Sequence, residues 1–170
     1  MLENKQTFEE NFKNMPVLSS SRLILKKIGP QDYSSIIDIT MYDGESCKDE
    51  SDVKNIITKI NTDIINEKSL HWGIFLKESS QLVGVCGYYR GFENNCGEIG
   101  YVINTEYQGN GFMSEAVSVL CEFGSVNLKL DFIFAYTDEK NFSSQSVLKK
   151  NNFINVSIDK GELKYAYNAK

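Results

Sequence analysis

The segment "EYQGNGFMSEA", residues 106–116, decides between two folds because it contains the Asn110-Gly111 dipeptide. Asn-Gly is typical of a two-residue turn between antiparallel strands, so it predicts a β-hairpin. The residues after it instead have the i, i+3, i+4, i+7 apolar spacing of a helix: Met113, Ala116, Val117 and Leu120. We therefore interpret the segment as a loop that leads from a strand into a helix, and we expect Gly124 to close that helix.

This loop lies within a regular succession of strands and helices. Short apolar runs predict strands at 21–28, 70–77, 81–89, 97–103, 130–137, 153–158 and 162–167. Helical spacing predicts helices at 29–41, from 53 onward, at 113–124 and at 141–152. Residues 104–129 join two strands through one helix, as a right-handed parallel crossover does. We predict an α/β fold of the order β-α-α-β-β-β-α-β-α-β-β, with a mixed sheet of about seven mostly antiparallel strands and helices on both faces.

An acidic stretch, "DGESCKDESD" at residues 43–52, is typical of a solvated loop. Ser51 and Asp52 are expected to cap the following helix. One apolar stripe on that helix favours a place against the core: Val53, Ile56, Ile57, Ile60 and Ile64. Residues 1–17 are interpreted as an appendage or a short helix, and residues 18–170 as one domain.

Composition and charge narrow the classes of function. The 170 residues are 41% hydrophobic and carry a net charge of -5 without a basic block, so we expect no nucleic-acid partner, and a cationic substrate fits better. The cysteines have neither metal-site spacing nor the spacing of a redox pair, so no metal is expected: Cys47, Cys86, Cys96 and Cys121. No leader and no apolar run near the roughly 20 residues of a membrane span is evident, so we expect a cytoplasmic protein that does not enter a membrane.

The strand-to-helix loop has the chemistry of a phosphate site. Gly109 and Gly111 allow a ligand to approach the backbone closely, and the first N–H groups of the helix carry the positive end of its dipole. The loop matches neither the P-loop nor the G-x-G-x-x-G pattern. Spacing alone therefore leaves two interpretations, a pyrophosphate cradle and a plain loop.

Two segments together resemble a known family. "EIGYVINTEYQGNGFMSEA" and "NFSSQSVLKKNNF" are similar to the GNAT superfamily of acetyl-CoA-dependent N-acetyltransferases, in its branch of ribosomal-protein N-terminal (alanine/serine) acetyltransferases. The family's pyrophosphate motif, Gln/Arg-x-x-Gly-x-Gly/Ala, falls on Gln108, Gly111 and Met113, and Met113 departs from it. The opening "LSSSRLILKKIGPQDY" also resembles this branch, so the resemblance covers about residues 18–158.

The resemblance implies a site for acetyl-CoA between two parallel strands that splay apart. The implied cofactor-binding residues are Val102, Ile103, Gln108, Gly109, Asn110, Gly111, Phe112, Met113, Asn141 and Ser144. Only the backbones of Val102 and Ile103 would be used. Asn141 has an alternative interpretation as an ordinary helix N-cap.

Two residues are implied as catalytic. Many relatives place a thiolate-protonating Tyr where this chain has Leu148, whereas the ribosomal-protein branch has a Ser at the position of Ser144, which becomes the acid or sulfur-stabilising group. An amine is mainly protonated at neutral pH, so attack on a thioester needs a base. Glu98, at the start of the strand implied to hold the acetyl group, is the candidate, and a solvated strand-end carboxylate is its alternative. Cys121 is expected to be inert, which favours direct transfer, and Asn152 replaces a usual Gly.

Two functions of different class remain open. The first is an acetyl-CoA-dependent N-acetyltransferase whose acceptor is a protein N-terminus or a small amine such as a polyamine, an amino acid or an antibiotic. The second is a non-catalytic acetyl-CoA-binding sensor or interaction module. The resemblance places loop 43–52 beside the acceptor site, where it would select cations. The chain is expected to be a monomer or a homodimer.

Overall fold

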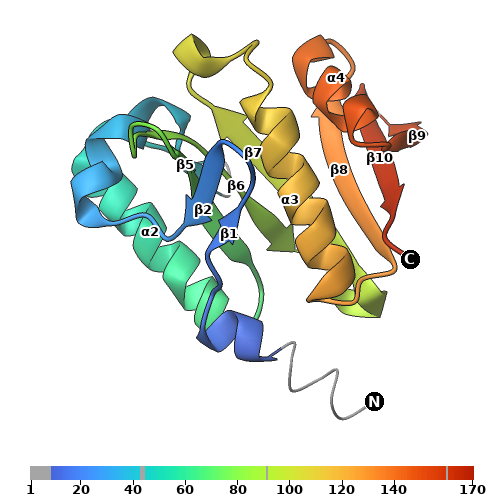
Figure 1. The fold of residues 1–170 in the computed structure, drawn as a ribbon, viewed down its shortest axis with the longest axis horizontal. Coiled ribbons are helices and arrows are strands. Elements are labelled where there is room, and N and C mark those ends of the chain that lie inside the picture. Colours follow the sequence, from blue (N-terminus) through green and yellow to red (C-terminus); the bar gives the residue numbers. More distant parts are fainter. Residues whose placement is uncertain (1–8, 43–44, 91, 160) are drawn as a thin grey trace.

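A computed structural model describes residues 9–42, 45–90, 92–159 and 161–170 of the chain, and one large sheet runs through it (Figure 1). Its strand order is β1-β2-β5-β6-β7-β8-β10-β9. The strands are β1 (Leu18–Ser19), β2 (Leu23–Lys26), β5 (Leu70–Leu76), β6 (Leu82–Arg90), β7 (Cys96–Ile103), β8 (Phe132–Asp138), β10 (Glu162–Asn168) and β9 (Ile154–Asp159). Neighbouring strands pair antiparallel, except that β7 and β8 are parallel. The predicted α/β fold is confirmed.

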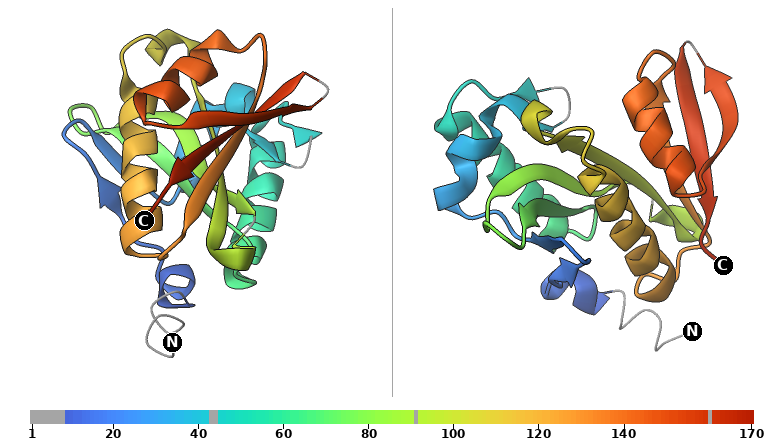
Figure 2. Two further views of the ribbon diagram at one scale, coloured as in Figure 1. Left: turned by 90° about the vertical axis from the view of Figure 1, so that its right-hand side faces the viewer. Right: turned by 45° about the horizontal axis from the view of Figure 1, so that its top comes forward.

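Helices cover both faces of this sheet, as predicted (Figure 2). On one face, α3 (Phe112–Val126) and α4 (Phe142–Lys150) bury the larger core, which includes Trp72, Tyr88 and Leu120. On the other face, η1 (Pro30–Ile39) and α2 (Glu50–Ile65) cover a smaller core around Ile36 and Phe75. Shorter elements complete the described chain: the 3₁₀ turns η2 (Glu93–Asn95) and η3 (Thr105–Tyr107), and a two-stranded pair of β3 (Met41–Tyr42) with β4 (Glu45–Ser46).

The parallel pair forms a fork in the sheet. Cys96–Glu98 of β7 pair with Phe132–Phe134 of β8, and this is the whole of their register within the described residues. Beyond Glu98 and Phe134 the two strands diverge, with η3 and α4 at the open end (Figure 1). The fork is the predicted splay, and it divides the sheet between the crossover helix α3 and the C-terminal strands.

Three predictions for residues 29–52 were wrong. The first helix, predicted at 29–41, is 3₁₀ rather than α, and its Tyr33, Ile36, Ile37 and Ile39 pack against the smaller core. Asp49, not Ser51 or Asp52, caps α2, and its side chain accepts a hydrogen bond from the Asp52 N–H at 3.0 Å. The same acidic stretch also contributes β4, while its residues 43–44 lie outside the described chain.

Gly124 does not close its helix either, since α3 continues to Val126. The Tyr88 hydroxyl lies against Gly124, where a Cβ atom would collide with it. That hydroxyl donates a 2.8 Å hydrogen bond to the carbonyl of Leu120. The glycine therefore permits close packing between the helix and β6. Asn152, by contrast, adopts a left-handed φ of 63°, as expected for a residue that replaces glycine at a helix end.

The N-terminal segment contacts the main core. Residues 9–13 are helical, and Phe12 is 3% exposed within the larger core. The Trp72 indole N–H donates a 2.8 Å hydrogen bond to the Pro16 carbonyl. The division into residues 1–17 and 18–170 stays a prediction. No helix in the described part of the chain is long and apolar enough to cross a membrane.

Candidate active site

The loop between β7 and α3 has the backbone of a ligand cradle. Gly109 and Gly111 have φ values of 76° and 79°, in the left-handed region that favours glycine, and Gly111 is the N-cap of α3. The predicted strand-to-helix loop is therefore present. Asn110 stabilises it, because its side-chain amide donates to the carbonyls of Tyr107 and Gln108 at 3.2 and 3.1 Å. The first N–H groups of α3 therefore point out of the N-terminal end of the helix at Gly111, which has no side chain to cover them.

A cluster of polar contacts fastens this loop to the N-terminal strands. Glu115, in the first turn of α3, accepts hydrogen bonds from the hydroxyls of Ser20 and Ser21 and from Arg22, whose guanidinium lies 2.7 Å from it. Arg22 also donates to the Asn110 carbonyl at 3.1 Å. We call this group the Arg22–Glu115 clamp. It joins two segments about 90 residues apart in sequence.

Partial burial would raise the pKa of Glu115, but the hydrogen bonds of the clamp outweigh it and lower that pKa to about 2. The carboxylate is therefore charged at neutral pH. Its charge is balanced by Arg22, so the clamp adds little net charge beside the loop.

A cavity of about 730 Å³ lies between this loop, β7 and α4. It brings together most of the residues that the sequence predicted for the cofactor: Val102, Ile103, Gln108, Gly109, Gly111, Phe112, Met113, Asn141 and Ser144. Asn110 and Glu98 are not among the residues that line it. Segments separated by some 30 residues thus form one cleft at the open end of the fork.

The start of α4 forms the far wall of the cleft. Asn141 is the N-cap of α4, and its side-chain oxygen Oδ1 accepts a 3.0 Å hydrogen bond from the Ser144 N–H. The alternative interpretation of Asn141 is therefore correct, and the same residue also lines the cleft. The Ser144 hydroxyl lies 3.0 Å from the hydroxyl of Tyr101, a residue of β7. This hydrogen bond bridges the fork.

Glu98 lies at the point where the fork opens, since it pairs with Phe134 in the last parallel step. Arg90 lies 3.5 Å from its carboxylate. Burial raises the pKa of Glu98, and the Arg90 charge opposes that rise. A carboxylate with a raised pKa is a better proton acceptor than an exposed one.

The comparisons with known proteins agree with this geometry. The Acetyltransferase (GNAT) domain family matches residues 22–154. The chain belongs to the GNAT acetyltransferase family. Among its relatives, the uncharacterized N-acetyltransferase p20 of Bacillus licheniformis is 31% identical over 147 residues, which cover 82% of this chain and 83% of that protein. The chain is accordingly an N-acetyltransferase, and transfer of an acetyl group from acetyl-CoA to an amine is the reaction of its family.

Solved structures of acetyltransferases have the same fold. A GNAT-family acetyltransferase from Bacillus anthracis has a TM-score of 0.77 at 25% identity and covers 91% of this chain and 99% of its own. The ribosomal L7/L12 alpha-N-protein acetyltransferase RimL, solved in complex with coenzyme A, has a TM-score of 0.76 at 14% identity and covers 90% of this chain and 98% of its own. The latter likeness shows the fold alone.

Three other residues of this acetyltransferase bear on the proposed chemistry: Leu148, Cys121 and His71. Leu148, at the position of the Tyr in many relatives, is fully buried in the core. Burial raises the pKa of the Cys121 thiol to about 12, so it carries almost no thiolate at neutral pH. Burial lowers the pKa of His71 to about 4, with Asp63 opposing, so its imidazole is neutral. In the described part of the chain, no group of three or more His, Cys, Asp or Glu residues is placed to hold a metal ion.

Sequence reasoning missed Tyr101 and the clamp. Burial raises the pKa of Tyr101 to about 12, although its hydrogen bond to Ser144 opposes this, so the phenol stays protonated. Strand alternation could have placed Tyr101 on the face of α3 and α4, because it lies two residues after buried Ile99 and so points to the same face. Its contact with Ser144, 43 residues away, has no local signal.

Proposed function

We propose that this acetyltransferase moves the acetyl group of acetyl-CoA directly to a primary amine, with the cofactor held in the cleft at the fork. The observation that carries the proposal is that both implied motifs, at Gln108–Met113 apart from Asn110 and at Asn141–Ser144, line one cavity. Its volume of about 730 Å³ lies within the range of small-molecule sites. A plain loop would not require the second motif beside it.

The loop fits the pyrophosphate of the cofactor. A Cβ atom built on Gly109 would meet nothing within 4 Å, so there is room beside the backbone for a bulky group. The N–H groups that begin α3 supply donors for an anion. Val102 and Ile103 pair with β6 but lie beyond the residues of β7 that pair with β8, and they line the cleft, where backbone groups would suit the amide-containing pantetheine arm.

Two side chains would assist the transfer. The amine nitrogen forms a bond to the acetyl carbon while the carbon–sulfur bond breaks. Glu98 takes the amine proton, directly or through water, and Ser144 donates a hydrogen bond that stabilises the departing thiolate, which then takes a proton from solvent to become the thiol. Tyr101 supports this role by bonding to the Ser144 hydroxyl and so directing it. The inert Cys121 favours transfer without an acyl-enzyme.

Thiol release with acetyl-CoA and a panel of amines and peptides tests the proposal. Ser144→Ala should lower turnover while leaving acetyl-CoA affinity, measured by calorimetry, nearly unchanged. Ser146→Ala is a matched control, because Ser146 lines the same cavity two residues further along α4. Absence of acetyl-CoA binding would refute the site. Binding without turnover across the whole panel would instead support the sensor interpretation.

A further inference from the structure

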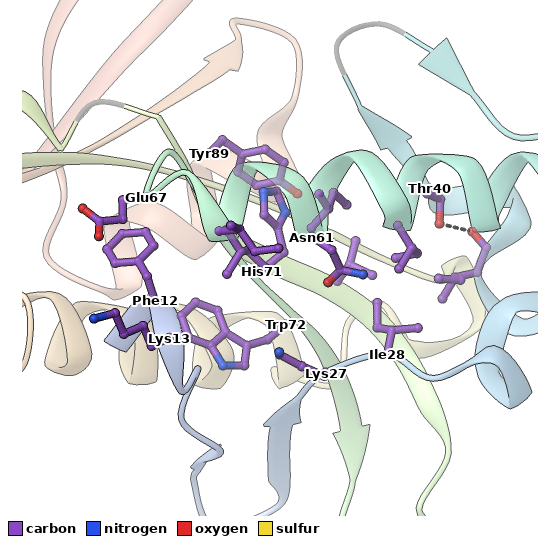
Figure 3. Close-up of a pocket in the computed structure, with 16 residues that line it drawn as sticks. Phe12, Lys13, Lys27, Ile28, Thr40, Asn61, Glu67, His71, Trp72 and Tyr89 are labelled. Atoms are coloured by element: carbon purple, nitrogen blue, oxygen red, sulfur yellow. Dashed lines mark hydrogen bonds between the residues drawn. The ribbon is translucent and has the colours of Figure 1, made fainter. Parts of the chain in front are cut away.

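A second cavity, of about 690 Å³, lies between α2 and the sheet (Figure 3). Its lining is mainly aliphatic and aromatic: Ile28, Ile36, Ile57, Ile60, Ile64, Ile65, Phe12, Trp72, Val85 and Tyr89. Six polar or charged residues also line it, with His71 and Asn61 near its middle and Thr40 at one end (Figure 3). A mainly apolar lining with polar groups at a few points is typical of a small-molecule site.

One residue separates this cavity from the cofactor cleft. Tyr89 lines the second cavity, and its ring lies against Gly100, where a Cβ atom would be only 2.7 Å from it. Gly100 lines the cofactor cleft. The His71 ring packs edge-on against Tyr89 with 4.3 Å between the ring centroids and helps to hold it there. The Tyr89–Gly100 contact is thus a thin wall between the two sites.

Glu98 faces the same side of the sheet as this second cavity. It lies two residues before Gly100 in β7, so both point to one face. The sheet register continues that row from Arg90 through Glu98 and Phe134 to Ala166. The carboxylate therefore has an aromatic side chain beside it, that of Phe134, on the face opposite α3 and α4.

Charges near the second cavity are balanced, so its apolar lining decides the class of ligand. Lys13, Lys27 and Glu67 line the cavity, and the charge of Asp63 acts on its His71. Around Glu98, the charges of Arg90 and Lys164 are opposed by that of Glu162. A ligand with several positive charges would lose hydration against the apolar lining, whereas a ligand with one amine and an apolar body would bring a single charge to Glu98.

We propose that the second cavity holds the apolar body of the acceptor, and that the acceptor is a primary monoamine with an aromatic or branched aliphatic group rather than a polyamine. The inference rests on the proposed acetyl transfer and names its substrate class. The amine would enter past Tyr89 to reach Glu98, and the lining isoleucines would cover the apolar group.

Trp72 gives a readout that does not depend on catalysis. It is the only tryptophan of the chain and lines the second cavity. Titration with 2-phenylethylamine should change its fluorescence in a saturable way, and titration with spermidine should not. Thiol release at one pH should then favour 2-phenylethylamine over spermidine in kcat/KM by about tenfold or more.

Two variants locate the effect. Ile60→Phe fills the cavity and should weaken both the fluorescence response and kcat/KM for 2-phenylethylamine, while Val126→Phe, an enlargement at an exposed site on α3, should change neither. Lys27→Glu, at an exposed residue, should improve the use of spermidine relative to the control Lys54→Glu on the outer side of α2. Unchanged acetyl-CoA affinity would show that each variant is folded.

The outcomes separate this inference from the proposed function. Acetylation of amines without a Trp72 response, or equal use of both amines in parent and Ile60→Phe protein, would overturn the second cavity as the acceptor site and leave acetyl transfer intact. A saturable Trp72 response without thiol release would keep the ligand site and refute the proposed transfer.

Discussion

At the scale of single residues, the fork places two candidate catalytic groups on opposite faces of one strand. Glu98 pairs with Arg90 on the face opposite α3 and α4, whereas Tyr101 reaches Ser144 on the face of α4. In the proposed mechanism, the acceptor would approach from one side while the thiol leaves on the other. Removal of the amine proton would then be separated in space from stabilisation of the departing sulfur.

Glu98→Gln should lower turnover by roughly a hundredfold near neutral pH, because the amide cannot accept the amine proton. Raising the pH should restore much of the rate by supplying uncharged amine, near pH 8 for an α-amine and near about pH 10 for a lysine side chain. Both kinds of amine fall within the monoamine class proposed above, so the pH at which the rate recovers identifies the acceptor. A pH–rate profile measures this, with Glu122→Gln at an exposed site of α3 as the control. Identical profiles of parent and Glu98→Gln protein would remove Glu98 from the mechanism.

Tyr101→Phe removes the hydroxyl that bonds to Ser144 without changing the ring. Turnover should fall by about fivefold to tenfold with acetyl-CoA affinity unchanged, because the Ser144 hydroxyl loses its orientation. Combined with Ser144→Ala it should cause no further loss, since the two act as one unit. Tyr136→Phe, at another tyrosine that lines the cleft, is the control. Additive losses in the double variant would show that Tyr101 acts independently.

At the scale of elements, the start of α3 and its clamp define the loop proposed to bind the cofactor. Gly111→Asp should abolish acetyl-CoA binding, because a negative charge would stand where the pyrophosphate is proposed to lie. Gly111→Asn introduces a side chain of the same shape as aspartate but without the charge, and asparagine tolerates a left-handed φ. This variant should bind acetyl-CoA more weakly than the parent but measurably. Gly161→Asp, at another glycine with a left-handed φ of 83°, controls for backbone strain. Calorimetry measures all three, and parent-like affinity in Gly111→Asp protein would refute this placement.

The clamp should make stability depend on pH in the acidic range. The pKa of Glu115 is about 2 in the folded chain, below the roughly 4.3 of an unfolded glutamate. The stability that its ionised form adds is therefore complete above about pH 4.3 and is lost as the pH falls towards 2. Glu115→Gln should therefore unfold at lower urea concentration than the parent at pH 6, and the difference should shrink at pH 3. Glu106→Gln, at an exposed position of η3, should show no such effect. A difference independent of pH would contradict the ionic role.

Local patterns predicted the elements better than their contacts. Helical spacing after Gly111 identified the crossover helix correctly because α3 is amphipathic over its whole length, and strand alternation identified the sheet. The 3₁₀ form of η1 was missed because residues spaced by three fit both helix types. The Tyr101–Ser144 bond and the Arg22–Glu115 clamp depend on how distant segments pack, which no local pattern encodes.

At the scale of the whole molecule, the N-terminal helix is tied to the core. Phe12 is 3% exposed and packs edge-on against Phe92 at 5.3 Å. Phe12→Ala should lower the free energy of unfolding by about 3 kcal/mol, because it leaves a cavity in the main core. Val17→Ala, at a residue 67% exposed, should change it little. Urea denaturation measures both, and a negligible effect of Phe12→Ala would support residues 1–17 as an appendage outside the domain.

The short pairing of β7 with β8 has a consequence for cellular metabolism. The loop and the open strand edge would recognise the pyrophosphate and the pantetheine arm, which acetyl-CoA and free coenzyme A have in common. Only the acetyl group distinguishes acetyl-CoA from free coenzyme A, so free coenzyme A should compete with it for the cleft. The rate of acetylation in a cell would then depend on the ratio of acetyl-CoA to free coenzyme A, and thus on the supply of carbon, more closely than on the amount of either compound.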